Sequence, residues 1–415
     1  MADDLITGLD LGSSSIRVVV GQSLPSEDGT PKLHIAGAIS VPANGIHKGA
    51  ISSMEDAVSS ISKALERAER MTGVALNSAW VSIAGQQILV QESRGVIGVA
   101  KPDGEIQEED VERAIEAART VATPSNYEIL HVIPKSFTVD GQQGIKDPVG
   151  MNGIRLEVDA VIIQTLTSQI KNVTKSIYRT GLDIDDLVFS PLATSEAVLS
   201  QRQKELGVCL VDIGASTSTM VVYEEGDILH TAVLPFGGDH FTSDIAIGLR
   251  TSLEVAEQIK YQLGQCVPTH VSSKEDYLLS DFGSQEQDAF KQKFIAEICE
   301  ARAEELFEAI DGELRKVDRS GMLPVGIVLT GGGMKLQGMV DVSKRVLRLP
   351  SSLGEVQNVS GVIDEVHDIA FATAIGLTQW GYTIKSAKKG RFNFSLGNMG
   401  DLKKKLSKLI KTIIP

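Results

Sequence analysis

The feature that most constrains the fold of this chain is one short pattern that occurs twice. Residues 9–15 read Leu-Asp-Leu-Gly-Ser-Ser-Ser, and residues 211–217 read Val-Asp-Ile-Gly-Ala-Ser-Thr. Apolar residues typical of β-strands flank both copies. The two copies are too far apart for a solenoid repeat. The sequence therefore predicts two lobes that arose by duplication, each starting with a strand, a turn and a strand.

The rest of the chain alternates between strand and helix patterns, which is typical of the α/β class. Its 415 residues are enough for two or three domains. Between residues 85 and 163 the pattern changes, because one acidic helix at residues 107–121 is expected among several strands. This segment reads as a small α+β subdomain inserted into the first lobe. Further strands are expected at residues 5–9, 16–20, 33–41, 79–84 and 161–166, and helices at residues 53–72 and 167–180.

Composition restricts the partners and the environment. The net charge of −14 argues against general binding to nucleic acid. No apolar run approaches the roughly 18–20 residues that span a bilayer, and the acidic N-terminus has no pattern of a secretory signal. The three cysteines are far apart and form no CxxC motif, so we expect reduced thiols in a cytosolic protein.

Both copies of the repeated pattern form a turn rich in glycine and small hydroxyl side chains. Such a turn directs backbone N–H groups and hydroxyls at one point, a geometry that binds phosphate oxygens. Arg17 lies on the strand after the first turn and adds a cationic donor if it occupies the face of the strand that meets the site. Asp10 and Asp212 would face each other across a cleft and hold the waters of a hydrated Mg²⁺. One turn alone could be an ordinary hairpin, but two copies in register favour a phosphate site.

A third glycine-rich segment lies at residues 328–334 and follows an apolar strand. Glycines let the backbone approach a flat ring closely. Next to two phosphate turns, we therefore expect a site for a purine and its ribose here. The alternative is a strand-to-helix loop that only tolerates glycine.

With these three segments, the sequence resembles the actin-like ATPase superfamily. Connecting helices of small residues, at residues 191–199 and 370–377, complete the five parts expected of it. Within the superfamily, the chain resembles the FtsA family of bacterial cell-division proteins over nearly its whole length. The motifs behind this narrower resemblance lie at residues 131–134, 139–141, 147–151, 153–157, 244–246, 249–251 and 256–260.

The resemblance implies an α/β, two-lobed actin-like fold of duplicated ribonuclease-H-like units, with the inserted subdomain and a C-terminal amphipathic helix. Its divisions would be 1A, residues 1–84 and 163–206; 1C, residues 85–162; 2A, residues 207–240 and 322–384, with the last helix packing back on 1A; 2B, residues 241–321; a linker, residues 385–397; and the terminal helix, residues 398–415.

The resemblance also implies which residues bind ATP and Mg²⁺. Phosphate contacts would come from Gly12, Ser13, Ser14, Ser15 and Arg17 in the first lobe, and from Gly214, Ala215, Ser216 and Thr217 in the second. The adenosine would lie against Gly331, Gly332 and Met334. Glu257 and Lys260 would reach ribose and base, unless they form only a surface ion pair. Asp10 and Asp212 would orient Mg²⁺ through water.

Glu196 has two readings. It takes the place where actin has a glutamine that positions the attacking water. A carboxylate there could act as a general base for slow ATP hydrolysis. The alternative is a solvated helix residue with no part in the chemistry.

The C-terminal segment is basic, with nine Lys or Arg residues and one Asp between residues 385 and 415. An apolar stripe at helical spacing comprises Leu402, Leu406, Leu409, Ile410, Ile413 and Ile414. Its flanks and far side carry Lys403, Lys404, Lys405, Lys408 and Lys411. This pattern suits a helix that lies on an anionic lipid membrane. The alternative is a helix docked on the acidic body of its own chain.

On these grounds we expect an ATP-binding, actin-like protein that polymerises and anchors the FtsZ ring to the cytoplasmic face of the inner membrane at the division septum. The resemblance implies that subdomain 2B binds the C-terminal peptide of FtsZ, with Arg302 at the family's basic position. It implies that the inserted subdomain serves self-association and later division proteins. A PilM-like pilus-assembly component and a small-molecule kinase remain as alternatives, but neither explains the basic tail.

Overall fold

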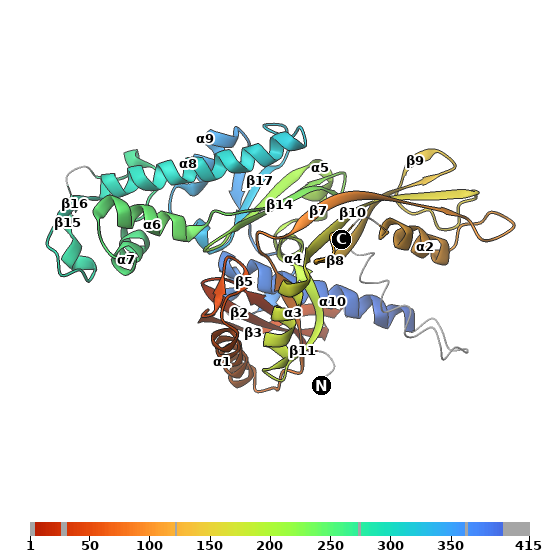
Figure 1. Cartoon of the computed structure of the whole chain (residues 1–415), viewed down its shortest axis with the longest axis horizontal. Coiled ribbons are helices and arrows are strands. Elements are labelled where there is room, and N and C mark those ends of the chain that lie inside the picture. The colour runs from red at the N-terminus through yellow and green to blue at the C-terminus, as the bar shows by residue number, and fades with distance from the viewer. Residues whose placement is uncertain (1–4, 26–30, 121–122, 273–274, 362–363, 393–415) are drawn as a thin grey trace.

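The molecule is built around two β-sheets, one in each lobe. The structure is a computed structural model that describes residues 5–25, 31–120, 123–272, 275–361 and 364–392. In Figure 1 the first lobe lies below the second. The first sheet has the order β11-β6-β1-β2-β3-β19 and the second β14-β13-β12-β17-β18. Their strands are β1 (Leu5–Leu11), β2 (Ser15–Pro25), β3 (Pro31–Pro42), β6 (Ser78–Ile83), β11 (Asp183–Phe189), β19 (Ser360–Gly361), β12 (Val208–Ile213), β13 (Ser218–Glu224), β14 (Asp227–Leu234), β17 (Gly326–Thr330) and β18 (Ser351–Leu353).

Both sheets have the same topology. In each, three consecutive strands form an antiparallel meander, and two later strands add in parallel beside the first. The register also agrees, because Asp10 pairs with Arg17 across the first turn and Asp212 pairs with Thr219 across the second. The predicted duplication is therefore confirmed.

Helices α1 (Met54–Thr72) and α3 (Thr167–Tyr178) pack against each other beside the first sheet. The residues of α1 that recur at helical spacing are buried there, namely Ala57, Ile61, Ala64, Leu65 and Ala68. The helix ends at Gly73, whose left-handed φ of 71° is a common stop for a helix. The helix predicted at residues 53–72 is confirmed.

Two helices cross between the lobes. α4 (Ser190–Val198) follows the first sheet, but its apolar side chains share one core with β12 and β13 of the second. α10 (Ala372–Phe392) follows the second sheet and packs on β1 and β2 of the first. A Cβ on Gly376 would lie only 1.8 Å from the carbonyl oxygen of Ala193. Glycine at this position therefore allows the two backbones to cross in contact.

The length of α10 corrects one prediction. The sequence predicts a linker from residue 385, but the helix continues to Phe392. Residues 385–392 contain Lys, Ala and Arg, which are strong helix formers, and no proline, so one glycine does not end the helix. The predicted membrane helix at residues 398–415 lies outside the described residues. Within the described part of the chain, no helix is long and apolar enough to cross a membrane.

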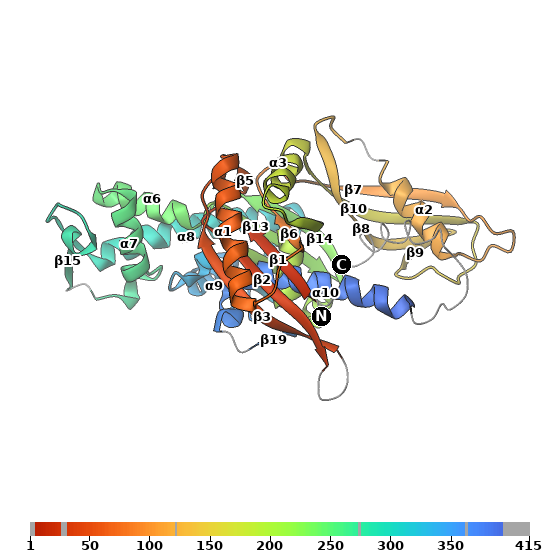
Figure 2. The same cartoon turned by 90° about the horizontal axis from the view of Figure 1, so that it is seen from below.

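The inserted subdomain is a four-stranded sheet with one helix on its face, as Figure 2 shows. The sheet has the order β7-β10-β8-β9, and helix α2 packs on β7 and β10. Their bounds are β7 (Leu89–Gly98), α2 (Glu108–Ala118), β8 (Tyr127–Val139), β9 (Gln142–Ile145) and β10 (Arg155–Leu166). The subdomain has an apolar core of its own, so the predicted α+β insertion is confirmed.

The inserted subdomain contacts both lobes. On β8, Nε2 of His131 accepts a hydrogen bond of 3.0 Å from the backbone N–H of Phe189, directly before α4. The His131 ring lies 6.1 Å from the Trp380 ring of α10. Lys146, directly after β9, forms an ion pair with Asp227 at the start of β14 in the second lobe. The insertion is thus attached both to the crossing helices and to the second sheet.

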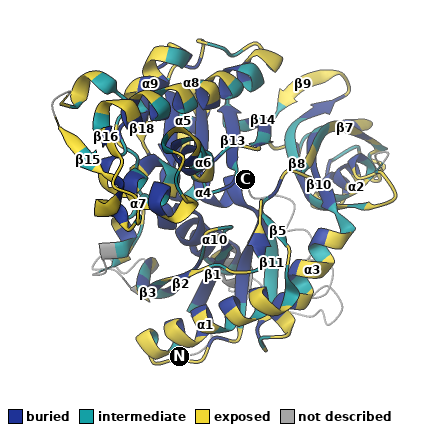
Figure 3. Cartoon of the chain, turned by 60° about the vertical axis from the view of Figure 1, so that its left-hand side comes forward, coloured by how far each residue is buried: buried dark blue, intermediate teal, exposed yellow. Residues whose placement is uncertain are grey.

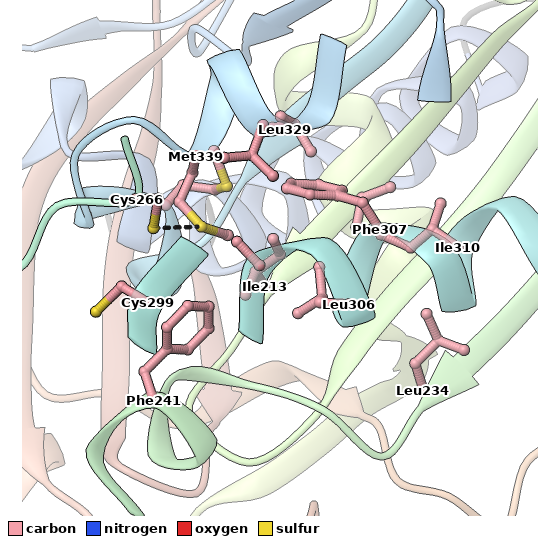
Figure 4. Packing of buried hydrophobic residues seen from close by; sticks show 14 of the residues in the cluster. Ile213, Leu234, Phe241, Cys266, Cys299, Leu306, Phe307, Ile310, Leu329 and Met339 are labelled. Carbon is pink, nitrogen blue, oxygen red and sulfur yellow. Dashed lines mark hydrogen bonds between the residues drawn. The ribbon is translucent and has the colours of Figure 1, made fainter. Parts of the chain in front are cut away.

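A helical subdomain extends the second lobe at the end opposite to the insertion (Figure 1). It consists of α6 (Gly238–Leu249), α7 (Leu253–Leu263), α8 (Gln292–Lys316) and the hairpin of β15 (Asp276–Leu278) and β16 (Ala289–Lys291). Its core is continuous with that of the second sheet and includes Phe241, Phe307 and the free, buried cysteines Cys266 and Cys299 (Figure 4). Burial raises the pKa of the Cys299 thiol to about 12, so this thiol stays protonated.

Exposed residues gather on the outer helices, whereas the sheets and the crossing helices are largely buried (Figure 3). The remaining elements are β4 (Ile46–His47), β5 (Ala50–Ile51), α5 (Gln201–Leu206), η2 (Pro268–His270), η3 (Leu279–Phe282), η4 (Gly332–Lys335), α9 (Met339–Leu347), η5 (Asp364–His367) and η6 (Ile369–Phe371).

Candidate functional site

One cavity of about 510 Å³ opens between the two lobes. The turns after β1 and β12, the loop after β17 and helix α7 form its walls. Fifteen of the predicted site residues therefore meet in one place: Asp10, Gly12, Ser13, Ser14, Ser15, Arg17, Asp212, Gly214, Ala215, Ser216, Thr217, Glu257, Lys260, Gly331 and Gly332.

The two turns close tightly and in the same way. A Cβ on Gly12 would lie 2.6 Å from the carbonyl oxygen of Ser15, and a Cβ on Gly214 2.9 Å from that of Thr217. In the second turn, the N–H of Gly214 donates to the Thr217 carbonyl over 3.0 Å. Turns this tight need glycine, and they bring successive backbone N–H groups to the cavity wall.

Asp10 and Asp212 lie at the ends of β1 and β12, beside the cavity. Burial, and then the negative charge of Asp10, raise the pKa of the Asp212 carboxyl to about 6. Burial also raises the pKa of Asp10, although the Arg17 guanidinium and a hydrogen bond of 2.8 Å from Ser82 Oγ act against it. Two carboxylates therefore repel each other where little water screens them.

Arg17 carries the positive charge closest to this pair. Its Nη1 lies 3.8 Å from Oδ2 of Asp10, and its guanidinium carbon lies 5.7 Å from the centre of the Phe371 ring. Its Nε is buried and has no hydrogen-bond partner among the described residues. Arg17 as a whole lines the cavity, and a guanidinium in the wall fits a ligand that brings anionic oxygen atoms.

The same residues fit a magnesium ion. Asp10 and Asp212 offer carboxylate oxygens, the ligand type that Mg²⁺ prefers, and a cation between them would offset their repulsion. In the described part of the chain, no group of three or more His, Cys, Asp or Glu could hold a metal alone. The ion would therefore keep several waters and take further oxygens from a phosphate, which is common for Mg²⁺.

Helix α7 supplies a further part of the cavity wall. Lys260 Nζ donates to Thr242 Oγ1 over 2.6 Å and to the Gly238 carbonyl over 3.2 Å, and burial lowers the pKa of its ammonium group. Glu257 accepts a hydrogen bond of 3.2 Å from the Tyr261 hydroxyl. Both predicted residues line the cavity, so neither is merely a surface residue.

The structure does not bring two of the residues predicted for the nucleotide site to the cavity. Met334 is buried in the core of the second lobe and does not line the cavity wall. Glu196 accepts a hydrogen bond of 2.6 Å from Lys204 Nζ, away from the cavity. Thr194, two residues earlier on α4, faces Asp212, so Glu196 lies on the other side of the helix. Arg302, which the family resemblance implies as a contact of the FtsZ peptide and not of the nucleotide, lies on α8, where its guanidinium contacts Asp244 and Glu305.

Several residues of the wall were not predicted. Gly238 and Asp239 begin α6, and their N–H groups donate to the second turn, at Gly214 and Ala215. The glycine pair before this helix is a signal that could have revealed them, because helix N-termini bind anions. Thr373 comes from the start of α10, and no local pattern marks it as part of the site.

Comparison with known proteins decides the family. A family model described as cell division protein FtsA matches residues 209–376, and one described as the SHS2 domain inserted in FtsA matches residues 85–164. The chain is 39% identical over 378 residues to cell division protein FtsA of Bacillus subtilis, covering 91% of this chain and 83% of that protein. The chain belongs to the FtsA family. The predicted family and the predicted place of its insertion are thus confirmed.

Other FtsA proteins match over a similar length. Cell division protein FtsA of Pseudomonas aeruginosa is 35% identical over 377 residues, which cover 91% of this chain and 89% of that protein. The Escherichia coli protein is 33% identical over 384 residues, which cover 91% and 90%. The FtsA relationship therefore extends over both lobes and the insertion.

Solved structures agree on the fold of this FtsA-family chain. The PilM–PilN type IV pilus biogenesis complex matches with a TM-score of 0.66 at 17% identity, covering 91% of this chain and 98% of that one. MreB5 of Spiroplasma citri bound to ADP matches with a TM-score of 0.55 at 12% identity, covering 93% and 98%. At such low identity these likenesses show the actin-like fold alone, and PilM is a structural neighbour only.

Proposed function

We propose that this FtsA-family protein binds Mg²⁺·ATP between its lobes, forms actin-like polymers and anchors the FtsZ ring to the membrane. The observation that carries the nucleotide part is the meeting of two equivalent turns, from the two halves of the chain, in one cavity. The fold shared with an ADP-bound MreB supports it.

In this proposal the triphosphate lies between the two turns. Their backbone N–H groups and the guanidinium of Arg17, which lines the cavity, bind its oxygens. Asp10 and Asp212 hold the magnesium ion through its waters, and the bound ion supplies positive charge that neutralises the phosphates. Gly331 and Gly332 leave room for the adenosine, while Lys260 and Glu257 present polar groups to the ribose and base.

We propose that ATP acts mainly as a brace between the lobes and that its hydrolysis is slow. The residue predicted as a general base, Glu196, pairs with Lys204 outside the cavity. Each lobe supplies one of the two phosphate turns, so bound ATP would contact both lobes and hold them together. This role requires tight, reversible binding and no hydrolysis. Closure of the lobes around ATP would then favour polymer formation.

The remaining parts of the proposal rest on the family and the sequence. The basic C-terminal segment would bind anionic lipid at the cytoplasmic face of the inner membrane, at the division septum. The helical subdomain of the second lobe would bind the C-terminal peptide of FtsZ, with Arg302 among its candidate contacts. Self-association and the recruitment of later division proteins would use the inserted subdomain.

A single glycine tests the nucleotide site. A Cβ on Gly332 would meet no atom closer than 4.0 Å, so a leucine side chain there would fill the cavity without displacing the core. We expect Gly332→Leu to weaken binding of a fluorescent ATP analogue in Mg²⁺ at least about tenfold. Gly312→Leu is the matched control, because Gly312 lies on α8, away from the cavity, with no atom within 4 Å of its Cβ position. Equal binding by both variants and the parent would refute the site.

A further inference from the structure

Two threonine hydroxyls, from distant parts of the chain, meet at the carboxylate of Asp212. Thr373 Oγ1 donates to Oδ2 over 3.0 Å, and Thr194 Oγ1 lies 3.4 Å from the same oxygen. The two hydroxyls are 2.9 Å apart. Both threonines are almost fully buried, with 0% and 5% of Thr194 and Thr373 exposed. The arrangement is therefore a closed polar cluster with Asp212 as its charged member.

The threonines belong to the two helices that cross between the lobes. Thr194 lies on α4, which leads out of the first lobe, and Thr373 lies on α10, which leads back to it. The helices touch directly beside the cluster, at Ala193 and Gly376. Asp212 itself is the second-last residue of β12 and lines the cavity. One carboxylate thus contacts both connections between the lobes and the proposed magnesium site.

The cluster has fewer hydrogens than acceptors. Thr194 Oγ1 also lies 2.9 Å from the Ser190 carbonyl of its own helix. Two hydroxyl hydrogens therefore serve the Asp212 carboxylate, the Ser190 carbonyl and the hydroxyl between them. A hydrogen bond to a charged acceptor is stronger than one to a neutral acceptor, so the charge balance around Asp212 decides where the Thr194 hydrogen points.

We propose that Thr194 and Thr373 are positioning residues that tie the Asp212 carboxylate to the crossing of α4 and α10, so that Mg²⁺·ATP in the cavity and the angle between the lobes control each other. This inference rests on the proposed nucleotide function. Such control needs contacts that differ between the open and closed arrangements, and a shift of either helix against β12 changes these hydrogen bonds. By reciprocity, a partner that fixes the lobe angle changes the affinity for Mg²⁺·ATP by the same factor.

Isosteric variants separate this role from simple packing. Valine keeps the shape of threonine but removes the hydroxyl, whereas serine keeps the hydroxyl and removes the methyl group. We expect the full-length double variant Thr194→Val/Thr373→Val to bind a fluorescent ATP analogue roughly tenfold more weakly in Mg²⁺. In EDTA its affinity should equal that of the parent. The double serine variant should retain the affinity of the parent in both conditions.

A distance measurement tests the coupling directly. The three native cysteines are buried, so spin labels can be attached to Arg67→Cys on α1 and Lys344→Cys on α9, both exposed. In the parent, Mg²⁺·ATP should shift the distance between the labels. In the double valine variant this shift should be lost even at saturating nucleotide, and in the double serine variant it should persist.

Each outcome decides something. If the parent does not bind Mg²⁺·ATP, the proposed function fails rather than the coupling. If the parent binds and the double valine variant matches it in both measurements, the inference is wrong. It is also wrong if the serine variant loses as much as the valine variant, because methyl packing then explains the effect. Should the double valine variant fail to fold by circular dichroism, the two single valine variants decide by the same criteria.

Discussion

At the scale of single residues, Asp212 combines burial, a nearby carboxylate and a raised pKa at the junction of the two lobes. Its carboxyl group lies near the end of a buried strand and near a second carboxylate, and it has a pKa of about 6. In the absence of a cation, ionisation of this group works against folding. The repulsion between the two carboxylates is therefore unfavourable, and a magnesium ion bound between them would offset it.

The first prediction concerns Asp212→Asn in EDTA, without nucleotide. Because the pKa of Asp212 is about 6 when folded and 3.8 as the reference value, the folded chain binds the proton more tightly. The stability that this proton provides is present at low pH and is lost as the pH rises through 6. As the pH rises from 5.0 to 7.5, the free energy of unfolding of the variant should therefore increase by roughly 1.5 kcal/mol relative to that of the parent.

The measurement is urea unfolding of both proteins at the two pH values. Saturating Mg²⁺·ATP should stabilise the parent more than the variant, because only the parent retains the carboxylate proposed to hold the ion. A difference in the free energy of unfolding that does not change with pH would contradict the burial of a charged Asp212.

Local motifs allowed most of the site to be predicted, whereas contacts made by distant helices escaped prediction. Asp10, Asp212 and the turns after them follow from one repeated pattern. The sequence left two readings of Glu196 open, because eight of the nine residues of α4 are buried and no polar face reveals which side of the helix meets the cavity. Thr194 and Thr373 meet Asp212 only through the crossing of two helices.

At the scale of elements, the crossing of α4 and α10 connects the halves of the molecule. Each helix is attached to one sheet and packs on the other, so the two lobes share one apolar core around this crossing. The resemblance to the actin-like superfamily implied both connecting helices, and their small residues suit such a close crossing. It did not predict how far α10 extends, because charged helix formers such as Lys385 suit a helix and a linker equally well.

The second prediction compares one substitution at two glycines. Gly376→Ala places a Cβ 1.8 Å from the Ala193 carbonyl oxygen and forces the helices apart, so we expect a loss of about 1–3 kcal/mol in the free energy of unfolding. Gly312→Ala, in an open position on α8, should instead stabilise the protein by about 0.5–1 kcal/mol. Urea unfolding measures both. Equal effects would mean that the crossing is not in close contact.

At the scale of the whole molecule, the inserted subdomain bridges the lobes. It is rooted in the first lobe, its His131 contacts the backbone before α4, and its Lys146 pairs with Asp227 of the second lobe. A change in the lobe angle must therefore move the insertion or break this ion pair. A partner bound to the insertion would thereby be expected to influence the distant cavity.

The third prediction reverses these two charges. The side chains of Lys146 and Asp227 are 54% and 26% exposed, so the ion pair contributes at most about 1 kcal/mol to stability. Lys146→Asp and Asp227→Lys should each leave global stability nearly unchanged but speed amide hydrogen exchange in β9 and at the start of β14. The double exchange of charges should restore the slower rates. If the double variant exchanges as fast as the single ones, the pair does not hold the insertion.

The fourth prediction concerns the tail. Leu406→Glu with Ile410→Glu interrupts the apolar stripe and adds two negative charges, so the variant should remain in the supernatant with anionic liposomes while ATP binding is unchanged. Ser407→Glu with Thr412→Glu adds the same charge outside the stripe and should lose less binding. Sedimentation of the first variant like the parent would exclude the stripe as the anchor and favour a helix docked on its own chain.

The position of α10 in the chain bears on how a ribosome produces this molecule. The five main strands of the first sheet are complete at Phe189, but the helix that covers β1 and β2 begins only at Ala372. At about 5–20 residues per second, roughly 10–40 s of translation separate the two. During this interval the nascent first lobe presents an apolar sheet face to chaperones. The lobe that is translated first is therefore completed last, and a chain that stalls before α10 is a substrate for proteolysis rather than a functional half.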